Sequence, residues 1–258
     1  MDNMWLRRLS EFIVPTADEL VVLEEAKSDR REFKRNQLIS VEGAPVQEVY
    51  FLVDGWVESS VGVNYGRKQL TKIYLPGDFP GMPNVAMAQT AEQLVALNNV
   101  TMDVIPIDRL SLLFEKAPRF GCMLFVTAQQ ERVMLMDHLA TVGQTLAIQR
   151  VASLLLEVHR RLVALQPGIG NVLDWPLSQE RVAQSTGLTS VHVNRSFAEL
   201  TRRGLVARAG RQITLLDLQR LAELAGLPER DFAQRPSWLA TCCLPRERAL
   251  ARAPDKVR

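Results

Sequence analysis

The sequence contains no run of about 20 consecutive apolar residues, the length that a helix needs to cross a membrane. Its first residues carry several charges and lack the apolar core that is typical of a secretion signal. We therefore expect a cytoplasmic protein that does not associate with membranes. The formal net charge is only +2, so any surface that binds a polyanion must be a local patch.

Cysteine is also scarce, and the three residues of this type are Cys122, Cys242 and Cys243. Their spacing fits neither a zinc site nor an even set of disulfides, which indicates a reducing compartment. We expect Cys122 to pack inside a helix. The adjacent pair Cys242-Cys243 lies in an arginine-rich segment, where chance composition is the simpler explanation and a redox pair is the alternative.

The patterns that usually indicate catalysis are missing as well. There is no Ser-His-Asp arrangement, no glycine-rich loop for a phosphate group and no cluster with metal-ligand spacing. We therefore do not expect an enzyme, a bound metal or a resident cofactor.

The apolar pattern divides the chain into four segments. Residues 1–118 begin with an amphipathic helical stretch and continue, between about 32 and 107, with short β-rich runs and frequent turn signals, as in a small sandwich or barrel. Residues 119–143 form one long helix. Residues 144–226 form a second domain that opens with a helix near Ala147–Leu165. Residues 227–258, rich in proline, arginine and alanine, predict a flexible tail, and the fold class is α+β.

The most informative segment is Leu177–Leu200, which predicts two short helices joined by a tight turn. It has a capping residue for each helix, a small residue where the helices cross, a glycine for a turn with positive φ, and an apolar residue that inserts between the helices. These positions are Ser178, Thr189 or Ser190, Ala183, Gly187 and Val193. The arrangement is the one that places a second helix in the major groove of DNA, and a plain helical hairpin is the alternative.

The residues that follow predict a winged version of this helix-turn-helix. Arg202-Arg203-Gly204 ends the second helix with a glycine just beyond the cap. Residues 205–215 then read as a β-hairpin that turns at Ala209-Gly210. Arginines are concentrated in this part of the chain and form the expected basic patch: Arg181, Arg195, Arg202, Arg203, Arg208 and Arg211.

The long helix after Pro118 carries apolar residues at alternating spacings of three and four, the period of a coiled coil. It is apolar on more than one face, so one face can cover the β-rich domain while another meets a partner. We expect a homodimer along this helix, and packing within its own domain is the alternative. The seam positions are Phe125, Ala128, Arg132, Leu135, Leu139 and Val142. The charge of Arg132 needs an acidic neighbour there, such as Glu131.

Taken together, these features resemble the Crp/Fnr superfamily of bacterial transcription regulators. The most specific parts of the resemblance are Val49–Gly55, the Leu75-Pro76-Gly77-Asp78-Phe79 turn and the Gly187–Arg195 helix-turn-helix. The resemblance implies an amino-terminal β-roll of the cyclic-nucleotide-binding type, a long dimerisation helix and a carboxy-terminal winged helix. It also implies a homodimer that binds inverted-repeat promoter sites and contacts RNA polymerase. A ligand-binding regulatory protein that acts through a protein partner is the alternative.

The sequence departs from the cyclic-AMP-responsive members of this family. Those members follow the turn with a Gly-Glu pair and, some ten residues later, an Arg-Ser pair that clamps the cyclic phosphate. Here the corresponding residues are Gly81-Met82 and the stretch Thr90–Gln93, which contains Glu92. There is no arginine between Arg67 and Arg109, and a carboxylate repels a phosphate. On the long helix, Leu135-Met136 stands where such members have Thr-Ser. We therefore expect no cyclic-nucleotide binding.

Other cofactors of the family find no support in the sequence either. An iron–sulfur cluster of the oxygen-sensing kind needs a group of cysteines near the amino terminus, and no cysteine precedes Cys122. His138, His159 and His192 all fall on expected helices, outside the β-roll where haem binds. Without these cofactor signatures, the sequence is similar to the FixK-like branch of the family, whose members act without a known ligand. The effector, if there is one, stays unidentified.

The resemblance places Arg195 at the recognition-helix position that reads a guanine, and a surface pair with Glu199 is the alternative. Four other residues are exposed on the same stretch and are expected to face the bases: Ser190, Val191, His192 and Asn194. Family members often carry Glu where Val191 stands, so the target half-site is expected to differ. For His192 and Asn194, plain solvent exposure is an equal alternative.

A further group of residues is expected to contact phosphates rather than bases. Ser178, Gln179 and Thr189 lie at helix starts, where free backbone N–H groups favour anions. Arg208 and Arg211 would hold phosphates from the wing. Arg202 and Arg203 can instead complement the helix dipole.

Overall fold

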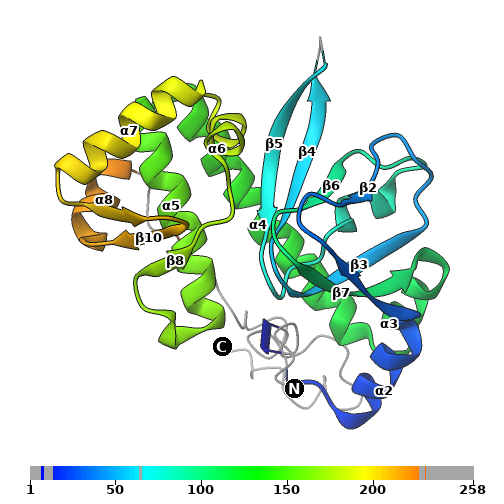
Figure 1. Cartoon of the computed structure of the whole chain (residues 1–258). Coiled ribbons are helices and arrows are strands. Elements are labelled where there is room, and N and C mark those ends of the chain that lie inside the picture. The colour runs from blue at the N-terminus through cyan, green and yellow to red at the C-terminus, as the bar shows by residue number, and fades with distance from the viewer. Residues whose placement is uncertain (1–6, 9–13, 64–65, 227–229, 231–258) are drawn as a thin grey trace, which may run out of the picture.

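The computed structural model describes residues 7–8, 14–63, 66–226 and 230. The part of the chain that it describes has a β-rich half and a helical half, joined by a long helix that runs behind the β-sheets (Figure 1). The predicted tail beyond residue 226, and with it Cys242 and Cys243, lies outside the described residues except for Arg230. The same holds for most of the first 13 residues.

The β-rich half is a roll of two antiparallel sheets. One sheet has the order β1-β7-β3 and the other the order β2-β6-β4-β5. The strands are β1 (Asp29–Phe33), β2 (Leu38–Ser40), β3 (Glu48–Asp54), β4 (Val57–Val63), β5 (Arg67–Tyr74), β6 (Gln93–Ala96) and β7 (Val100–Pro106). The 3-10 turns are η2 (Met82–Ala86) and η3 (Ile107–Arg109). Apolar side chains such as Leu52, Leu94 and Met102 fill the space between the two sheets. The expected sandwich or barrel is therefore confirmed.

Short helices close one end of the roll. Helix α2 (Ala17–Ala26) begins with a capping box, in which the Thr16 hydroxyl accepts from Glu19 N and the Glu19 carboxylate accepts from Thr16 N. It packs with α3 (Leu110–Lys116) and with the first turns of the long helix. No helix among the described residues is long and apolar enough to cross a membrane.

The long helix α4 (Pro118–Gln144) starts with proline in its first turn, where the missing N–H costs nothing. Phe120 and Met123 on its first turns are buried against the roll. A different face carries Phe125, Leu135 and Leu139 into solvent. The structure therefore shows both faces that the apolar pattern predicted.

The helical half is built around α5 (Ala147–Leu165), which begins and ends where the sequence predicted. It packs against α6 (Gln179–Thr186), α7 (Ser190–Arg202) and α8 (Leu218–Ala225). The wing is a three-stranded sheet of order β8-β10-β9, formed by β8 (Val172–Asp174), β9 (Val206–Ala209) and β10 (Gln212–Leu215). The segment before β8 holds the 3-10 turn η4 (Pro167–Ile169). The sequence predicted the β9–β10 hairpin but not β8 or α8.

The structure also records a disulfide at Cys122, which is half-buried on α4. We had expected a thiol packed inside a helix, so the prediction was wrong about the chemical state of this sulfur. Its location inside a helix was correct.

Candidate nucleic-acid interface

Helices α6 and α7 form the helix-turn-helix. Ser178 caps α6 by accepting a hydrogen bond from Arg181 N, and Thr189 caps α7 by accepting from His192 N. Gly187 ends α6 in the left-handed conformation, with a φ of 64° that other residues rarely adopt. Val193 is fully buried and Ala183 nearly so, as a close helix crossing requires. The caps, the turn glycine and the buried valine thus lie where the sequence predicted.

The outer face of α7 is open to solvent. Val191 and Arg195 are exposed one turn apart, and both point away from the buried face that holds Val193. The neighbouring side chains Ser190, His192 and Asn194 are exposed as well. The Nδ1 atom of His192 lies 3.2 Å from the Thr189 hydroxyl, which directs the other ring nitrogen outward. This face is therefore available to base edges.

Arg195 does not pair with Glu199 in the structure. The Glu199 carboxylate accepts hydrogen bonds of 2.8 Å from Arg202 Nε and 2.7 Å from Arg203 Nε. These two guanidinium groups lower the pKa of Glu199 to about 2. Within the described residues Arg195 has no ionic or hydrogen-bond partner, so its guanidinium is free to read a base.

The wing presents its two arginines in different settings. The guanidinium carbon of Arg208 lies 4.5 Å from the centre of the Phe197 ring on α7, in a cation–π contact. Arg211 lies at the other side of the β9–β10 turn and has Asp174 at 3.7 Å, with both side chains largely exposed. Arg208 therefore lies against α7, whereas Arg211 lies beside β8.

The start of α6 offers a further anion site. Ser178 is exposed, and its hydroxyl oxygen already accepts the Arg181 N–H, which leaves the O–H free to donate. Gln179 follows at the first helical position and is half-buried. Thr189 occupies the equivalent cap position of α7 and is exposed. The placement of all three residues fits phosphate contacts.

One member of the predicted basic patch lies elsewhere. Arg181 turns from α6 towards the β-roll, where its Nε lies 2.6 Å from Glu58 of β4. Its Nη1 donates to Asn36 at 3.0 Å. Arg181 thus connects the helical half to the β-roll, because its partner Glu58 is a buried carboxylate of the roll. Arg202 and Arg203, in turn, neutralise Glu199. The rest of the predicted patch consists of Arg195, of Arg208 on the Phe197 ring and of Arg211 near Asp174.

The exposed face of α4 holds most of the expected dimer seam. Phe125, Leu135 and Leu139 are 58%, 57% and 72% exposed, values unusual for such large apolar side chains. Ala128 and Arg132 are exposed on the same helix. Val142 is different, because its side chain lies against Gly187 of the helix-turn-helix and is half-buried. Glu131 pairs with Lys72 of β5 instead of compensating Arg132.

Comparisons with known proteins agree with these observations. Residues 149–224 match the Crp-like helix-turn-helix domain, and residues 30–117 match the cyclic nucleotide-binding domain. This order of domains, with a long helix between them, is the one seen in the structure. The chain belongs to the Crp/Fnr superfamily. This is a family of transcription regulators and not of enzymes.

Curated relatives of this Crp/Fnr protein include two named regulators. The chain is 28% identical over 214 residues to the transcriptional activator protein FnrL of Cereibacter sphaeroides, covering 81% of this chain and 85% of that protein. It is 32% identical over 162 residues to the nitrogen fixation regulation protein FixK of Bradyrhizobium diazoefficiens, covering 62% and 66%. Among solved structures, FixK2 from Bradyrhizobium japonicum matches with a TM-score of 0.71 and 26% identity, covering 78% and 98%. The FixK-like assignment is supported.

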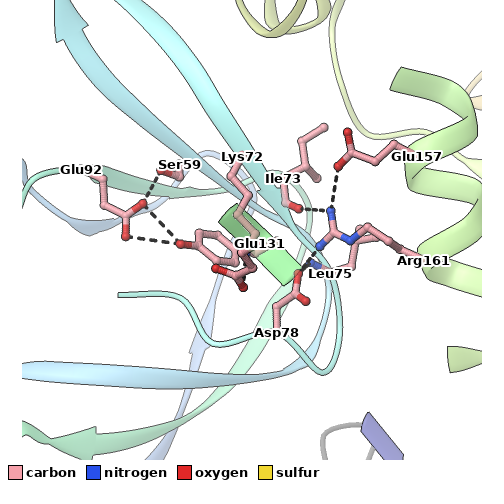
Figure 2. Close-up of polar contacts among 10 residues, drawn as sticks. Ser59, Lys72, Ile73, Leu75, Asp78, Glu92, Glu131, Glu157 and Arg161 are labelled. Carbon is pink, nitrogen blue, oxygen red and sulfur yellow. Dashed lines mark hydrogen bonds and ion pairs between the residues drawn. The ribbon is translucent and has the colours of Figure 1, made fainter. Parts of the chain in front are cut away.

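The β-roll of this Crp/Fnr protein contains a cavity of about 560 Å³ between its strands and α4. Glu92 projects into it and accepts hydrogen bonds from the Ser59 and Tyr74 hydroxyls (Figure 2). Burial raises the pKa of Glu92 above its ordinary value. Lys72, the basic residue that the strands contribute to the wall, pairs with Glu131 of α4. The polar groups of the cavity are thus arranged around carboxylates.

The histidines and the described acidic residues give no sign of a metal centre. His138 lies on α4, His159 is buried on α5 with Gly170 O at 3.1 Å, and His192 lies on α7. Among the described residues no three His, Cys, Asp or Glu side chains come together as metal ligands would. All three histidines are therefore on helices, as the sequence predicted.

Proposed function

We propose that this Crp/Fnr regulator binds double-stranded DNA as a homodimer and reads bases in the major groove with α7. The observation that carries the proposal is Arg195, exposed on the outer face of a capped α7 and free of partners among the described residues. An arginine in this position can donate two hydrogen bonds to O6 and N7 of a guanine. Ser190, Val191, His192 and Asn194 complete the base-facing surface, and Val191 offers an apolar contact to a thymine methyl group.

The dimer forms through α4. Its exposed apolar face is too large to leave in water, and a second copy of the same helix covers it by pairing Phe125, Leu135 and Leu139 across a two-fold axis. Such a dimer presents its two α7 helices about 34 Å apart. The DNA site is therefore an inverted repeat with half-sites about one helical turn apart.

The residues that contact phosphates lie around α7. Arg208 and Arg211 hold the backbone from the wing, and Ser178, Gln179 and Thr189 hold it from the helix starts. These contacts supply affinity for every sequence, whereas α7 supplies the preference for one. The relative FnrL is named a transcriptional activator, so we propose activation through contact with RNA polymerase as the outcome of binding.

The proposal is tested by selecting binding sites from a random duplex library and titrating the selected site at several salt concentrations. Arg195→Ala should cost about 1–3 kcal/mol on that site and relax the preference at one base pair of each half-site. Arg202→Ala is the matched control, because this arginine is on the same helix but pairs with Glu199. It should leave the selected motif unchanged. If no inverted repeat is enriched, or Arg195→Ala leaves the motif as it was, α7 is not the reading helix.

A further inference from the structure

The two halves of the chain meet at a hydrophobic interface. Trp56, at the turn before β4, and Trp175, before α6, are both buried, and their rings meet edge to face with centres 5.9 Å apart. Leu70, Ile73 and Leu75 of the roll belong to the same buried cluster as the core of the helix-turn-helix domain. Domains within one chain usually move relative to each other unless their interface is large and apolar. Here the interface is apolar and continuous with the core of the helix-turn-helix domain.

A buried ion pair crosses this interface. Arg161 of α5 pairs with Asp78, which follows β5, and also donates to Ile73 O at 2.8 Å (Figure 2). Asp78 accepts Leu75 N at 2.8 Å, so the same carboxylate holds its own turn in shape. The two side chains are only 16% and 10% exposed. Burial alone would raise the pKa of Asp78, but the neighbouring guanidinium prevails and keeps it below its ordinary value.

A second ion pair lies on the helix-turn-helix itself. Arg181 on α6 meets Glu58 of β4 at 2.6 Å, with side chains 17% and 10% exposed. One turn further along α6, the Gln184 carbonyl accepts a hydrogen bond from Gln69 of β5. The β4–β5 hairpin runs beside α6 (Figure 1). Helix α6, which precedes α7, is thus attached to the β-roll at Arg181 and at Gln184.

The covalent link between α4 and the helical domain is short and lies outside both helices. Thr145 and Leu146 are extended, with ψ values of 162° and 156°, and they join α4 to α5. Rotation at these two residues would swing the helix-turn-helix relative to the dimer axis. Val142 packs against Gly187, and a Cβ placed at that glycine would lie only 3.1 Å from the valine. The orientation of α7 therefore depends on contacts made outside α7, on α6 and at the turn that precedes α7.

We propose that the Asp78–Arg161 and Glu58–Arg181 pairs are positioning contacts that fix the separation of the two α7 helices and thereby set the half-site spacing that the dimer selects. The inference rests on the proposed function, because spacing has meaning only for a dimer on an inverted repeat. One added base pair moves a half-site by about 3.4 Å and turns it by about 34°. A rigidly held α7 cannot follow this displacement, whereas a domain released from the roll can.

The test uses the full-length protein and its selected half-sites, joined by spacers of the preferred length and of one and two base pairs more or fewer. Glu58→Gln and Asp78→Asn each remove one negative charge from the β-roll and leave the residues of α7 unchanged. Glu48→Gln is the matched control, because Glu48 pairs with Arg31 inside the roll at 2.6 Å. Each variant is first required to give the dimer mass and the helix content of the parent protein. If Asp78→Asn does not fold, Glu58→Gln alone carries the test.

In Glu58→Gln and Asp78→Asn, we expect the preference for the best spacer over its neighbours to fall about 2- to 30-fold, with the base preference in each half-site unchanged. In Glu48→Gln the spacer profile should stay that of the parent. A folded variant that loses affinity equally on every spacer, or keeps the parent profile, overturns the inference while leaving the proposed function in place. If the parent protein enriches no inverted repeat, the proposed function fails, and the inference fails with it.

Discussion

The guanidinium of Arg208 on the wing stacks over the ring of Phe197, a buried residue of the reading helix. The contact ties the β9–β10 hairpin to α7, so the wing and the recognition helix keep a fixed relation. Stacking also orders a long side chain in advance, which reduces the entropy lost when it meets a phosphate. Arg208 is thus a structural contact, and in the proposed function it is also one of the cations that hold a phosphate.

We predict that Arg208→Ala and Arg211→Ala weaken binding to all sequences to a similar degree. Each lost phosphate contact should lower the slope of log K against log salt by about 0.9. The measurement is a binding titration at four or more salt concentrations, on the selected site and on an unrelated duplex. Arg109→Ala is the control, because Arg109 is exposed on the β-roll, away from α7, and donates to Lys27 O. A change confined to the selected site would make Arg208 or Arg211 a base-reading residue instead.

The second prediction concerns the dimer. Leu135→Glu combined with Leu139→Glu places two charges on the exposed face of α4, where the second copy would have to bury them. We expect monomers in analytical ultracentrifugation and a loss of binding to the inverted repeat. Val21→Glu is the matched control, because Val21 is also 58% exposed but lies on α2. A double variant that keeps the dimer mass would show that α4 is not the seam.

The helix-turn-helix could be predicted closely because its determinants are local in sequence. A cap such as Ser178 or Thr189 acts on an N–H two or three residues away, and Gly187 is needed by the turn in which it stands. Helix α5 could be delimited for the same reason. The exposed apolar face of α4 was also predictable, since a periodic apolar stripe belongs to a single helix. The dimer along it stays a prediction.

The contacts between distant segments could not be predicted. Arg181 looked like part of a DNA-binding patch because its partner Glu58 is more than a hundred residues earlier in the chain. Glu131 was assigned to Arg132, its neighbour in sequence, whereas it pairs with Lys72 of β5. Strand β8 was missed because it is three residues long and becomes a strand by pairing with β10. In each case the partner residue or strand is distant in the sequence and is brought close only by the tertiary fold.

The third prediction is that cyclic AMP does not bind. A cyclic phosphate in the β-roll cavity would approach the buried Glu92 carboxylate, and the strand cation Lys72 is already paired with Glu131. A phosphate and a carboxylate repel each other, and Arg132 of α4 is the remaining arginine in the wall of this cavity. Isothermal calorimetry should show no heat of binding, and DNA affinity should be the same with and without cyclic AMP. A site of micromolar affinity or tighter would contradict this prediction.

The last prediction concerns Glu92 and the pH dependence of stability. Burial raises the pKa of this carboxyl in the folded protein above its ordinary value of 4.5. The folded state therefore holds the proton more tightly than the unfolded state does. Its contribution to stability is fully present below the unfolded pKa, and it declines as the pH rises through the folded pKa.

Glu92→Gln keeps the shape of the side chain and an oxygen that accepts from the Ser59 and Tyr74 hydroxyls, but it cannot ionise. The free energy of unfolding of the variant minus that of the parent should therefore increase as the pH is raised from 4 towards neutrality. Urea denaturation at several pH values measures this difference, in which the contributions of all other titrating groups cancel. A difference that is constant over this range, or that decreases with pH, would mean that Glu92 is stabilised as the charged form, with Lys72 outweighing the cost of burial.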